Sequence, residues 1–165
     1  TLSKTLGGGL PLSAVIASEA VAEAARANGF PHYTSHASDP LTAAVGLAVV
    51  DVIVDEKLTE RAAVTGQYLK DRLLELQQRY RVIGDVRGRG LLLGVEIVAD
   101  RTTKEPGHEL ITALSERCYE LGLNMNRVGG SHAVWRLAPP LTISEDEVDQ
   151  AIAIMDRALG EVAAA

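Results

Sequence analysis

Cysteine and aromatic residues are scarce in this sequence. Its 165 residues include one Cys, one Trp, one Phe and four Tyr. The single cysteine, Cys118, excludes a disulfide within the chain, and no Cys/His spacing is typical of a zinc site with thiolate ligands. No stretch approaches the ~20 apolar residues of a membrane-spanning helix, and no basic-then-apolar leader opens the chain. These absences predict a soluble cytoplasmic protein with no membrane partner.

Positive charge is also in short supply. The 16 Lys and Arg residues are outnumbered by 22 Asp and Glu residues, which gives a formal net charge of −6. Because binding to a nucleic-acid backbone depends on a field of positive charge, this balance argues against a nucleic-acid partner. The remaining composition, 47% hydrophobic and 23% charged, is typical of a globular protein.

The amino-terminal part of the chain begins without methionine and runs at once into a glycine cluster. A natural domain more often begins with disposable polar residues, so we expect a fragment. The apolar run 13–17 predicts a buried strand, and a helix is expected from the N-cap Ser18 to Asn28-Gly29. Residues 30–40 predict an irregular loop of the kind that carries function, followed by a mostly buried helix over 41–56.

The remainder of the chain predicts alternating helices and strands. A helix over 58–80 carries Leu69, Leu73, Leu76 and Tyr80 on one stripe. The further elements expected are a strand at 91–97, a helix at 109–121, strands at 123–126 and 133–137 joined by Gly129-Gly130, and a helix with a Ser144/Glu147 capping box that ends before Gly160. This alternation predicts an α/β class, with a small domain from residue 57 to 165.

Four segments of the sequence carry a resemblance to a known family. They are residues 3–12 (SKTLGGGLPL), 36–40 (HASDP), 84–96 (GDVRGRGLLLGVE) and 136–147 (RLAPPLTISEDE). In this order they resemble the landmarks of the class III aminotransferases, which have fold type I and depend on pyridoxal 5'-phosphate (PLP). The resemblance implies that residues 1–56 are the end of the PLP-binding large domain and that residues 57–165 form a small α/β carboxy-terminal domain.

Two segments narrow the resemblance within that family. Residues 33–40 (YTSHASDP) and 96–106 (EIVADRTTKEP) are most similar to the 2,2-dialkylglycine decarboxylases, which implies decarboxylation-coupled transamination of a 2,2-dialkylglycine with a keto acid acceptor. An ordinary aminotransferase of the ω-amino acid or ornithine type stays open, because the deciding residues lie outside this sequence. A non-catalytic module also stays open, since the sequence lacks the acidic partner of the pyridine nitrogen and the aromatic residue that stacks on the ring.

The resemblance also implies roles for three residues. Lys4 matches the lysine that binds PLP covalently and then moves protons at the reacting carbons. Ser35 matches a Thr or Ser that reaches the cofactor phosphate held mainly by the other subunit, which implies a homodimer or a dimer of dimers. Arg136 matches the arginine that binds the α-carboxylate of amino and keto acids, and its apolar context in segment 134–138 predicts an anionic partner. Without the resemblance, the alternatives are a solvated lysine, an ordinary loop serine and a salt-bridged arginine.

An alkali-metal site is implied at the end of the loop. Asp39, with the backbone carbonyls of Ser35 and Ala37, matches the place where dialkylglycine decarboxylases hold K+ or Na+. Oxygen ligands suit such hard cations. The alternative role for Asp39 is to cap the helix that starts after it, and the two roles are compatible.

Other polar residues are left without a catalytic role. The segment around Arg87 and Arg89 could bind an anion, but we expect it to lead into the first strand of the small domain, with glycines that permit close backbone approach. Cys118 is expected in the core. The four histidines, His32, His36, His108 and His132, lack the spacing of a metal triad and are expected in loops or at the surface, with His36 near the active site.

Overall fold

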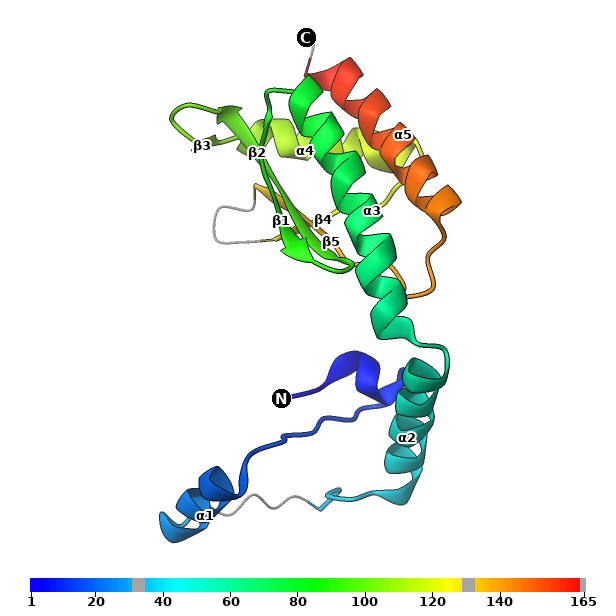
Figure 1. Cartoon of the computed structure of the whole chain (residues 1–165). Helices are drawn as coiled ribbons and strands as arrows, with labels where there is room; N and C mark the ends of the chain where they lie inside the picture. Colours follow the sequence, from blue (N-terminus) through cyan, green and yellow to red (C-terminus); the bar gives the residue numbers. More distant parts are fainter. Residues whose placement is uncertain (31–34, 129–132, 164–165) are drawn as a thin grey trace. The chain divides into compact units, whose positions relative to one another are not determined.

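The computed structural model describes residues 1–30, 35–128 and 133–163. They form two compact units, Thr1–Lys57 and Leu58–Ala165, which we call unit 1 and unit 2. Figure 1 shows unit 1 in blue to cyan and unit 2 in green to red. The predicted Gly129-Gly130 connection, His32 and His132 lie outside the described residues.

Unit 1 contains a short 3-10 helix and two α-helices: η1 (Lys4–Gly7), α1 (Glu19–Ala27) and α2 (Pro40–Asp55). Helix α1 begins after Ser18 and ends at Asn28, as the sequence predicts, with Gly29 at a φ of 67°. Helix α2 begins at Pro40 because proline suits the first helical position and the side chain of Asp39 accepts a hydrogen bond from the amide of Leu41.

Two predictions for unit 1 are wrong. Residues 13–17 form no strand: the pairing is limited to a single bridge between Leu2 and Ala14, and Val15 is 72% exposed. Helix α2 forms where expected but is not mostly buried. Both errors have the same cause, because apolar spacing predicts a face that favours burial, whereas burial also needs a covering layer. Among the described residues of unit 1, the buried ones are two glycines, Gly7 and Gly46.

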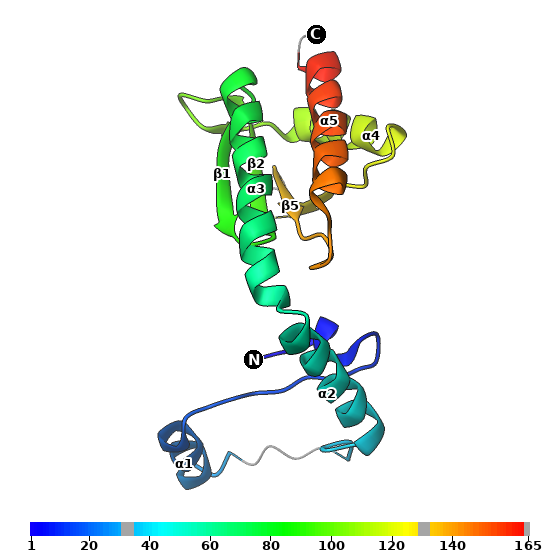
Figure 2. The same ribbon diagram turned by 45° about the vertical axis from the view of Figure 1, so that its right-hand side comes forward.

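Unit 2 is an α/β layer structure. Its elements are α3 (Leu58–Arg79), β1 (Ile83–Arg89), β2 (Leu92–Asp100), β3 (Glu105–Pro106), α4 (His108–Glu120), β4 (Asn126–Val128), β5 (Val134–Leu137) and α5 (Glu145–Val162). The strands form an antiparallel sheet in the order β1-β2-β5-β4, with β3 beside β2. The helices gather on one side of this sheet, where α3 packs on β1 and β2 and α4 packs on β2 (Figures 1 and 2). The opposite side carries no helix among the described residues of unit 2, and we call it the open face.

The core of unit 2 lies between the sheet and its helices. Strand β2 sends Val95 and Ile97 into it, and β5 sends Trp135, whose indole donates a hydrogen bond to the Ser115 hydroxyl at 2.8 Å. The predicted stripe of α3 faces the same core, with Leu73 fully buried. Since the helical and strand periodicities both point inward here, the predicted pattern for this unit is confirmed.

Some boundaries differ from the predicted ones. Strand β1 was expected only as a lead-in, yet it is a full strand, because it pairs along its length with β2. The strand expected at 123–126 instead starts at Asn126, where pairing with β5 begins. Helix α5 carries the predicted capping box but continues through Gly160 to Val162, since the backbone of Gly160 stays helical there. Glycine permits a helix to continue as well as to end.

Two glycines allow the close backbone approach that the sequence predicts. A Cβ at Gly66 of α3 would overlap the backbone of Gly90, and a Cβ at Gly88, where φ is 135°, would overlap the carbonyl oxygen of Leu92. Gly66 therefore lets α3 lie tightly against the turn between β1 and β2, and Gly88 lets β1 lie close to β2. None of the helices in the described residues is both long enough and apolar enough to span a membrane.

Candidate active site

Lys4 lies at the start of η1 in an uncommon backbone conformation. Its φ of 57° is in the left-handed region, which costs a non-glycine residue free energy and is often found at functional sites. The Lys4 side chain is exposed, and no carboxylate of the described residues pairs with it. The preceding backbone is held by two hydrogen bonds between Leu2 and Ala14, of 2.7 and 2.9 Å.

The glycines after Lys4 let its turn pack against α2. Gly8 has a φ of 54°, and a Cβ there would contact Val45 and Val49 of α2. In return, Gly46 of α2 leaves the room that Leu12 occupies, because a Cβ at Gly46 would overlap the Leu12 side chain. The backbone that carries Lys4 is thus fixed by close packing while its ammonium group remains accessible.

The loop before α2 carries Ser35, Ala37 and Asp39. The Asp39 carboxylate caps α2 through one oxygen, at 3.1 Å from the amide of Leu41, and the other oxygen lies 3.5 Å from Nδ1 of His36. The capping role that the sequence allowed for Asp39 is therefore present. No group of three His, Cys, Asp or Glu side chains with metal-binding geometry occurs in the described ranges. An alkali-metal site at Asp39 with the carbonyls of Ser35 and Ala37 stays a prediction.

A groove in unit 1 runs beside this loop. It is lined by residues 11–15 on one side and by residues 36–39 with Thr42 and Ala43 on the other. Neither Lys4 nor Ser35 is among the lining residues, although each lies close in sequence to one wall. His36 is exposed in this wall, in agreement with the expected loop position.

Arg136 lies on β5 of unit 2. The predicted apolar surroundings are found for its neighbours along the strand but not for the Arg136 side chain itself. Its neighbours Trp135 and Leu137 point toward the helices, but alternation along the strand sends Arg136 to the open face, where it is exposed. No carboxylate of the described chain forms an ion pair with Arg136. The expected anionic partner is therefore not supplied by unit 2.

The strand register places Arg136 in a row across the open face. Arg87 of β1 is paired with Gly94 of β2, Gly94 with Arg136 of β5, and Arg136 with Asn126 of β4. Arg87 differs from Arg136 because it is already neutralised, at 2.8 Å from Asp85 and 3.5 Å from Glu96. The hydrogen bond to Asp85, with the charge of Glu96, raises the pKa of the Arg87 guanidinium.

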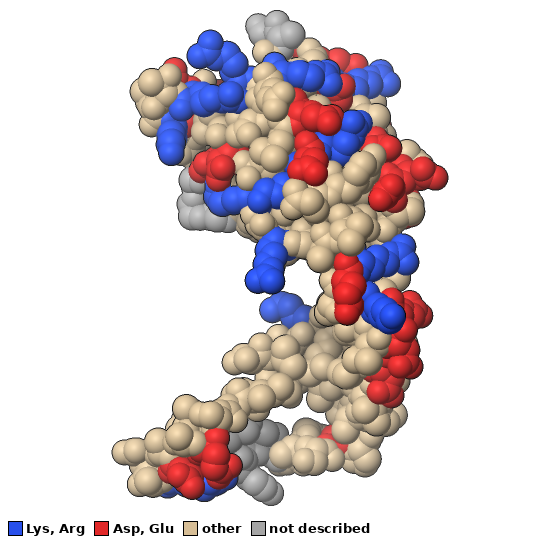
Figure 3. Space-filling view, in the orientation of Figure 1, with Lys and Arg blue, Asp and Glu red and all other residues tan. Residues whose placement is uncertain are grey.

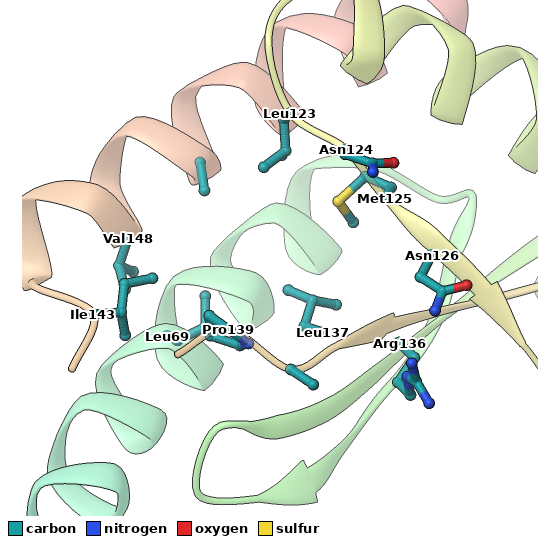
Figure 4. A pocket seen from close by; sticks show the side chains of 12 residues that line it. Leu69, Leu123, Asn124, Met125, Asn126, Arg136, Leu137, Pro139, Ile143 and Val148 are labelled. Carbon is teal, nitrogen blue, oxygen red and sulfur yellow. The ribbon is translucent and has the colours of Figure 1, made fainter. Parts of the chain in front are cut away.

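An apolar pocket of about 300 Å³ lies beside Arg136. Figure 4 shows Arg136 and Asn126 at one end and Ile143 and Val148 at the other, with Leu137 between them. Its lining from α3, α5 and Leu137 is apolar and lies on the helix side of the sheet, whereas the guanidinium of Arg136 points to the open face, so the pocket itself suits an apolar group. The sequence-based interpretation missed Asn126 and the pocket, because a row across strands is defined by register and not by spacing along the chain.

The structure thus divides the candidate site residues between its units. Lys4, Ser35, Ala37 and Asp39 belong to unit 1, and Arg136 belongs to unit 2. Arg87 and Arg89 lie on strand β1 and do not form an anion-binding loop. Cys118 is fully buried in the core of unit 2, as expected.

Comparison with known proteins supplies the family. The model of the family described as "Aminotransferase class-III" matches residues 1–159. An uncharacterized aminotransferase of Schizosaccharomyces pombe is 45% identical over 161 residues, which cover 96% of this chain and 36% of the relative. A leucine/methionine racemase of Thermococcus litoralis is 37% identical, over 98% of this chain and 36% of the relative. The chain therefore spans about a third of the length of these relatives.

A solved structure confirms the predicted fold class. A transaminase with L-ala matches 98% of this chain and 39% of its own, with a TM-score of 0.85 and 31% sequence identity. The α/β arrangement described above is thus similar to the corresponding part of a solved transaminase. With the family model matching nearly its whole length, the chain belongs to the class-III aminotransferase family.

Proposed function

We propose that the protein containing this chain is a PLP-dependent enzyme that acts on amino and keto acids, with Lys4 as the residue that binds the cofactor. The observation that carries the proposal is the position of Lys4 in segment 3–12 of the family match, on a turn that packs against α2 and leaves the lysine side chain exposed. Amine attachment to the cofactor aldehyde needs a reachable lysine that is not locked in an ion pair, and Lys4 meets both conditions.

When bound, PLP supplies a ring that accepts the electrons of a bond broken at the substrate's α-carbon. The residues of this chain would move the proton and bind the substrate. Lys4 would hold a proton on its amine and return it at the reacting carbon of the substrate. Arg136 holds the substrate carboxylate with two parallel hydrogen bonds and so orients the bonds at the α-carbon.

The finer proposal is decarboxylation-coupled transamination of 2,2-dialkylglycines with a keto acid acceptor. Its support is the sequence resemblance at residues 33–40 and 96–106 to dialkylglycine decarboxylases, together with the oxygen-rich turn at Asp39 for K+ or Na+. A plain class III aminotransferase is the second candidate, favoured by the aminotransferase among the relatives. The racemase among them indicates that this part of the chain is compatible with several reactions of amino acids.

The cofactor proposal is tested on the full-length protein that contains this chain. We expect a yellow protein whose absorbance disappears on borohydride reduction, with the pyridoxyl group mapped by mass spectrometry to Lys4. Lys57 is a matched control, because it is also an exposed lysine of unit 1 with a positive φ, of 51°. Lys4→Ala should abolish turnover and Lys57→Ala should not, whereas a pyridoxyl group on another lysine would overturn the assignment.

The reaction proposal is tested with two substrate pairs. Release of CO2 from 2-methylalanine in the presence of pyruvate supports the decarboxylase, and its absence with active transfer from an ordinary amino acid supports the plain aminotransferase. Replacement of K+ by Na+ in the same assay measures whether the reaction rate depends on the alkali-metal ion. Equal rates in both salts and in a large organic cation would contradict an alkali-metal site at Asp39.

The substrate role of Arg136 has a graded test. Arg136→Lys keeps the charge but loses the two-pronged contact, and Arg136→Ala loses both. One charge-assisted pair contributes ~1.5–3 kcal/mol, which corresponds to roughly ten- to 150-fold in kcat/KM. The loss should fall on amino and keto acids and spare amines without a carboxylate, whereas equal losses would indicate a structural residue.

The shared phosphate contact has a test of its own. If Ser35 serves the partner's cofactor, a mixed dimer of Lys4→Ala and Ser35→Asp subunits has one site with both changes and one intact site. The purified mixed dimer should then have half of the wild-type activity, and an equal mixture of the two inactive proteins should regain about a quarter, because only half of its dimers are mixed. If Ser35 and Lys4 act in the same site of one chain, mixing restores nothing.

A further inference from the structure

The open face of unit 2 holds two arginines in different electrostatic states. Arg87 is held by two carboxylates, Asp85 at 2.8 Å and Glu96 at 3.5 Å. Arg136 lies in the same row and has no carboxylate partner among the described residues. The difference matters because an arginine can bind a substrate carboxylate only when its own chain does not occupy it.

The strand register places Glu96 where its carboxylate could form an ion pair with Arg136. Glu96 of β2 is paired with Val134 of β5, so Arg136 is its diagonal neighbour on the same face. Diagonal neighbours lie about 7–8 Å apart, within reach of long side chains. Gly94 of β2 lies between Arg87 and Arg136 in this row, so no side chain of β2 separates the two arginines.

Gly94 itself is not needed for the fold. A Cβ there would lie 3.4 Å from Val134 Cγ1 and 3.8 Å from Arg87 Cγ, which are ordinary contacts, and no positive φ requires glycine. This distinguishes Gly94 from Gly88, where a Cβ would overlap the neighbouring strand. A glycine inside a strand without a structural need often marks a place that another group approaches closely.

We propose that Arg87 is a positioning residue, which holds the carboxylate of Glu96 and so keeps the guanidinium of Arg136 free for the substrate carboxylate. The inference rests on the proposed role of Arg136 in substrate binding. Arg87 touches neither substrate nor cofactor in this scheme and acts through Glu96.

The alternative position of Glu96 follows from charge. Asp85 and Glu96 are directly opposite each other on β1 and β2, and like charges in that arrangement repel. Arg87 relieves this repulsion by pairing with both. Without Arg87, the carboxylate of Glu96 is expelled from Asp85 toward the nearest unpaired cation of the open face, which is Arg136.

The test uses the full-length enzyme with Arg87→Met, which keeps the length of the side chain without its charge. An exposed pair between Glu96 and Arg136 should raise KM for amino acid substrates, and Kd for isobutyrate measured by calorimetry, about two- to fivefold. The values for an amine without a carboxylate should not change, and kcat should be unaffected. Arg87→Lys, which keeps a cation beside Glu96, should behave like the wild type.

Two double variants separate repositioning from a change of net charge. Arg87→Met with Glu96→Gln and Arg87→Met with Asp85→Asn have the same charge, but only Glu96 neighbours Arg136. We expect the Glu96→Gln variant to restore KM and Kd and the Asp85→Asn variant to leave them raised. Equal restoration by both would show that only long-range charge matters, and the proposal would then be wrong.

The remaining outcomes separate this inference from the function it rests on. If Arg136→Ala leaves isobutyrate binding unchanged, the substrate role of Arg136 fails, and the inference fails with it. If Arg136→Ala weakens binding while Arg87→Met does not, the inference alone fails. Thermal unfolding of each variant checks its fold, and Arg87→Gln replaces Arg87→Met if the latter does not fold.

Discussion

The two units of this chain distribute their apolar residues in opposite ways. In unit 2, the helices and one face of the sheet enclose a continuous core whose largest members, such as Trp135 and Leu73, are fully buried. In unit 1, large apolar side chains of α2 remain in contact with water, among them Leu47 at 63% and Val54 at 66% exposure. Figure 3 agrees with this contrast, because charged side chains are spread over the visible face of unit 2 and broad uncharged stretches separate them on unit 1.

The contrast teaches that an apolar pattern and an apolar core are different properties. Burial of apolar area provides most of the free energy that opposes chain entropy, at roughly 25 cal/mol per Å². Unit 2 obtains that free energy within itself. The elements of unit 1 are helical, but their apolar faces need a covering layer, as expected for a part of a longer protein in the family.

The largest expected effect compares one leucine from each unit. Leu73→Ala removes a fully buried side chain from the core of unit 2 and should lower the free energy of unfolding by about 2–5 kcal/mol. Leu47→Ala, on the exposed face of α2, should change it by less than about 0.5 kcal/mol in the same 165-residue chain. Urea unfolding followed by circular dichroism measures both. Similar losses would mean that α2 is covered in the isolated chain, and the comparison would fail.

The next effect uses the one thiol of the core. Burial raises the pKa of Cys118 to about 11, above the ~8.5 of a free cysteine. Between these values the unfolded chain loses a proton that the folded chain keeps, so stability falls as pH rises through this range. The expected loss is roughly 2–3 kcal/mol between pH 8.5 and pH 11.

Cys118→Ala provides the control for this pH dependence. The hydrogen bonds to Asp149 and Asp156 raise the pKa values of Tyr68 and Tyr80, so these side chains add a similar loss above pH 10 in both proteins. Subtraction of the two unfolding curves leaves the contribution of the thiol. A difference that does not vary with pH would show that the thiol is not buried in solution.

Local signals predicted much of unit 2. The stripe of Leu69, Leu73 and Leu76 on α3 and the Ser144/Glu147 box of α5 depend on residues three or four apart, and both are present. Tyr80, the last residue of the predicted stripe, lies just after α3. The limits of β1 and β4 depend on pairing between segments distant in the chain, which no local pattern encodes. The same reason explains why the row from Arg87 through Arg136 to Asn126 was not predicted.

The candidate site shows the same division. The glycines after Lys4 lie in the turn that packs on α2, but no local pattern of the sequence predicts the left-handed backbone of Lys4 itself. The apolar neighbours of Arg136 predicted a partner for its charge. Strand alternation places the guanidinium on the open face instead, because Trp135 and Leu137 occupy the core side.

A third prediction applies the comparison between tight and loose packing to two glycines of one hairpin. Gly88→Ala forces a side chain onto a φ of 135° and against the carbonyl of Leu92, so it should cost about 1–3 kcal/mol. Gly94→Ala meets only ordinary contacts in an extended strand and should be neutral or stabilise by up to ~1 kcal/mol. Thermal unfolding of the two variants measures both changes in stability. A loss at Gly94 equal to that at Gly88 would contradict the open space over Gly94.

The smallest expected effect compares the two serine caps, one in each unit. Ser144 begins α5 of unit 2, where its hydroxyl accepts from the amide of Glu147 at 3.2 Å while the Glu147 carboxylate accepts from the Ser144 amide at 2.8 Å. Ser18 begins α1 of unit 1 without any side-chain hydrogen bond to the helix.

Ser144→Ala should therefore lower the free energy of unfolding by about 1 kcal/mol, and Ser18→Ala should leave it unchanged. Both variants are measured by urea unfolding in the same buffer, with Ser115 left intact as the partner of Trp135. A serine at the N-cap stabilises a helix only when its hydroxyl reaches the free amides. Equal losses would therefore show that the Ser18 hydroxyl accepts a hydrogen bond from α1 in solution and that the two helices are capped alike.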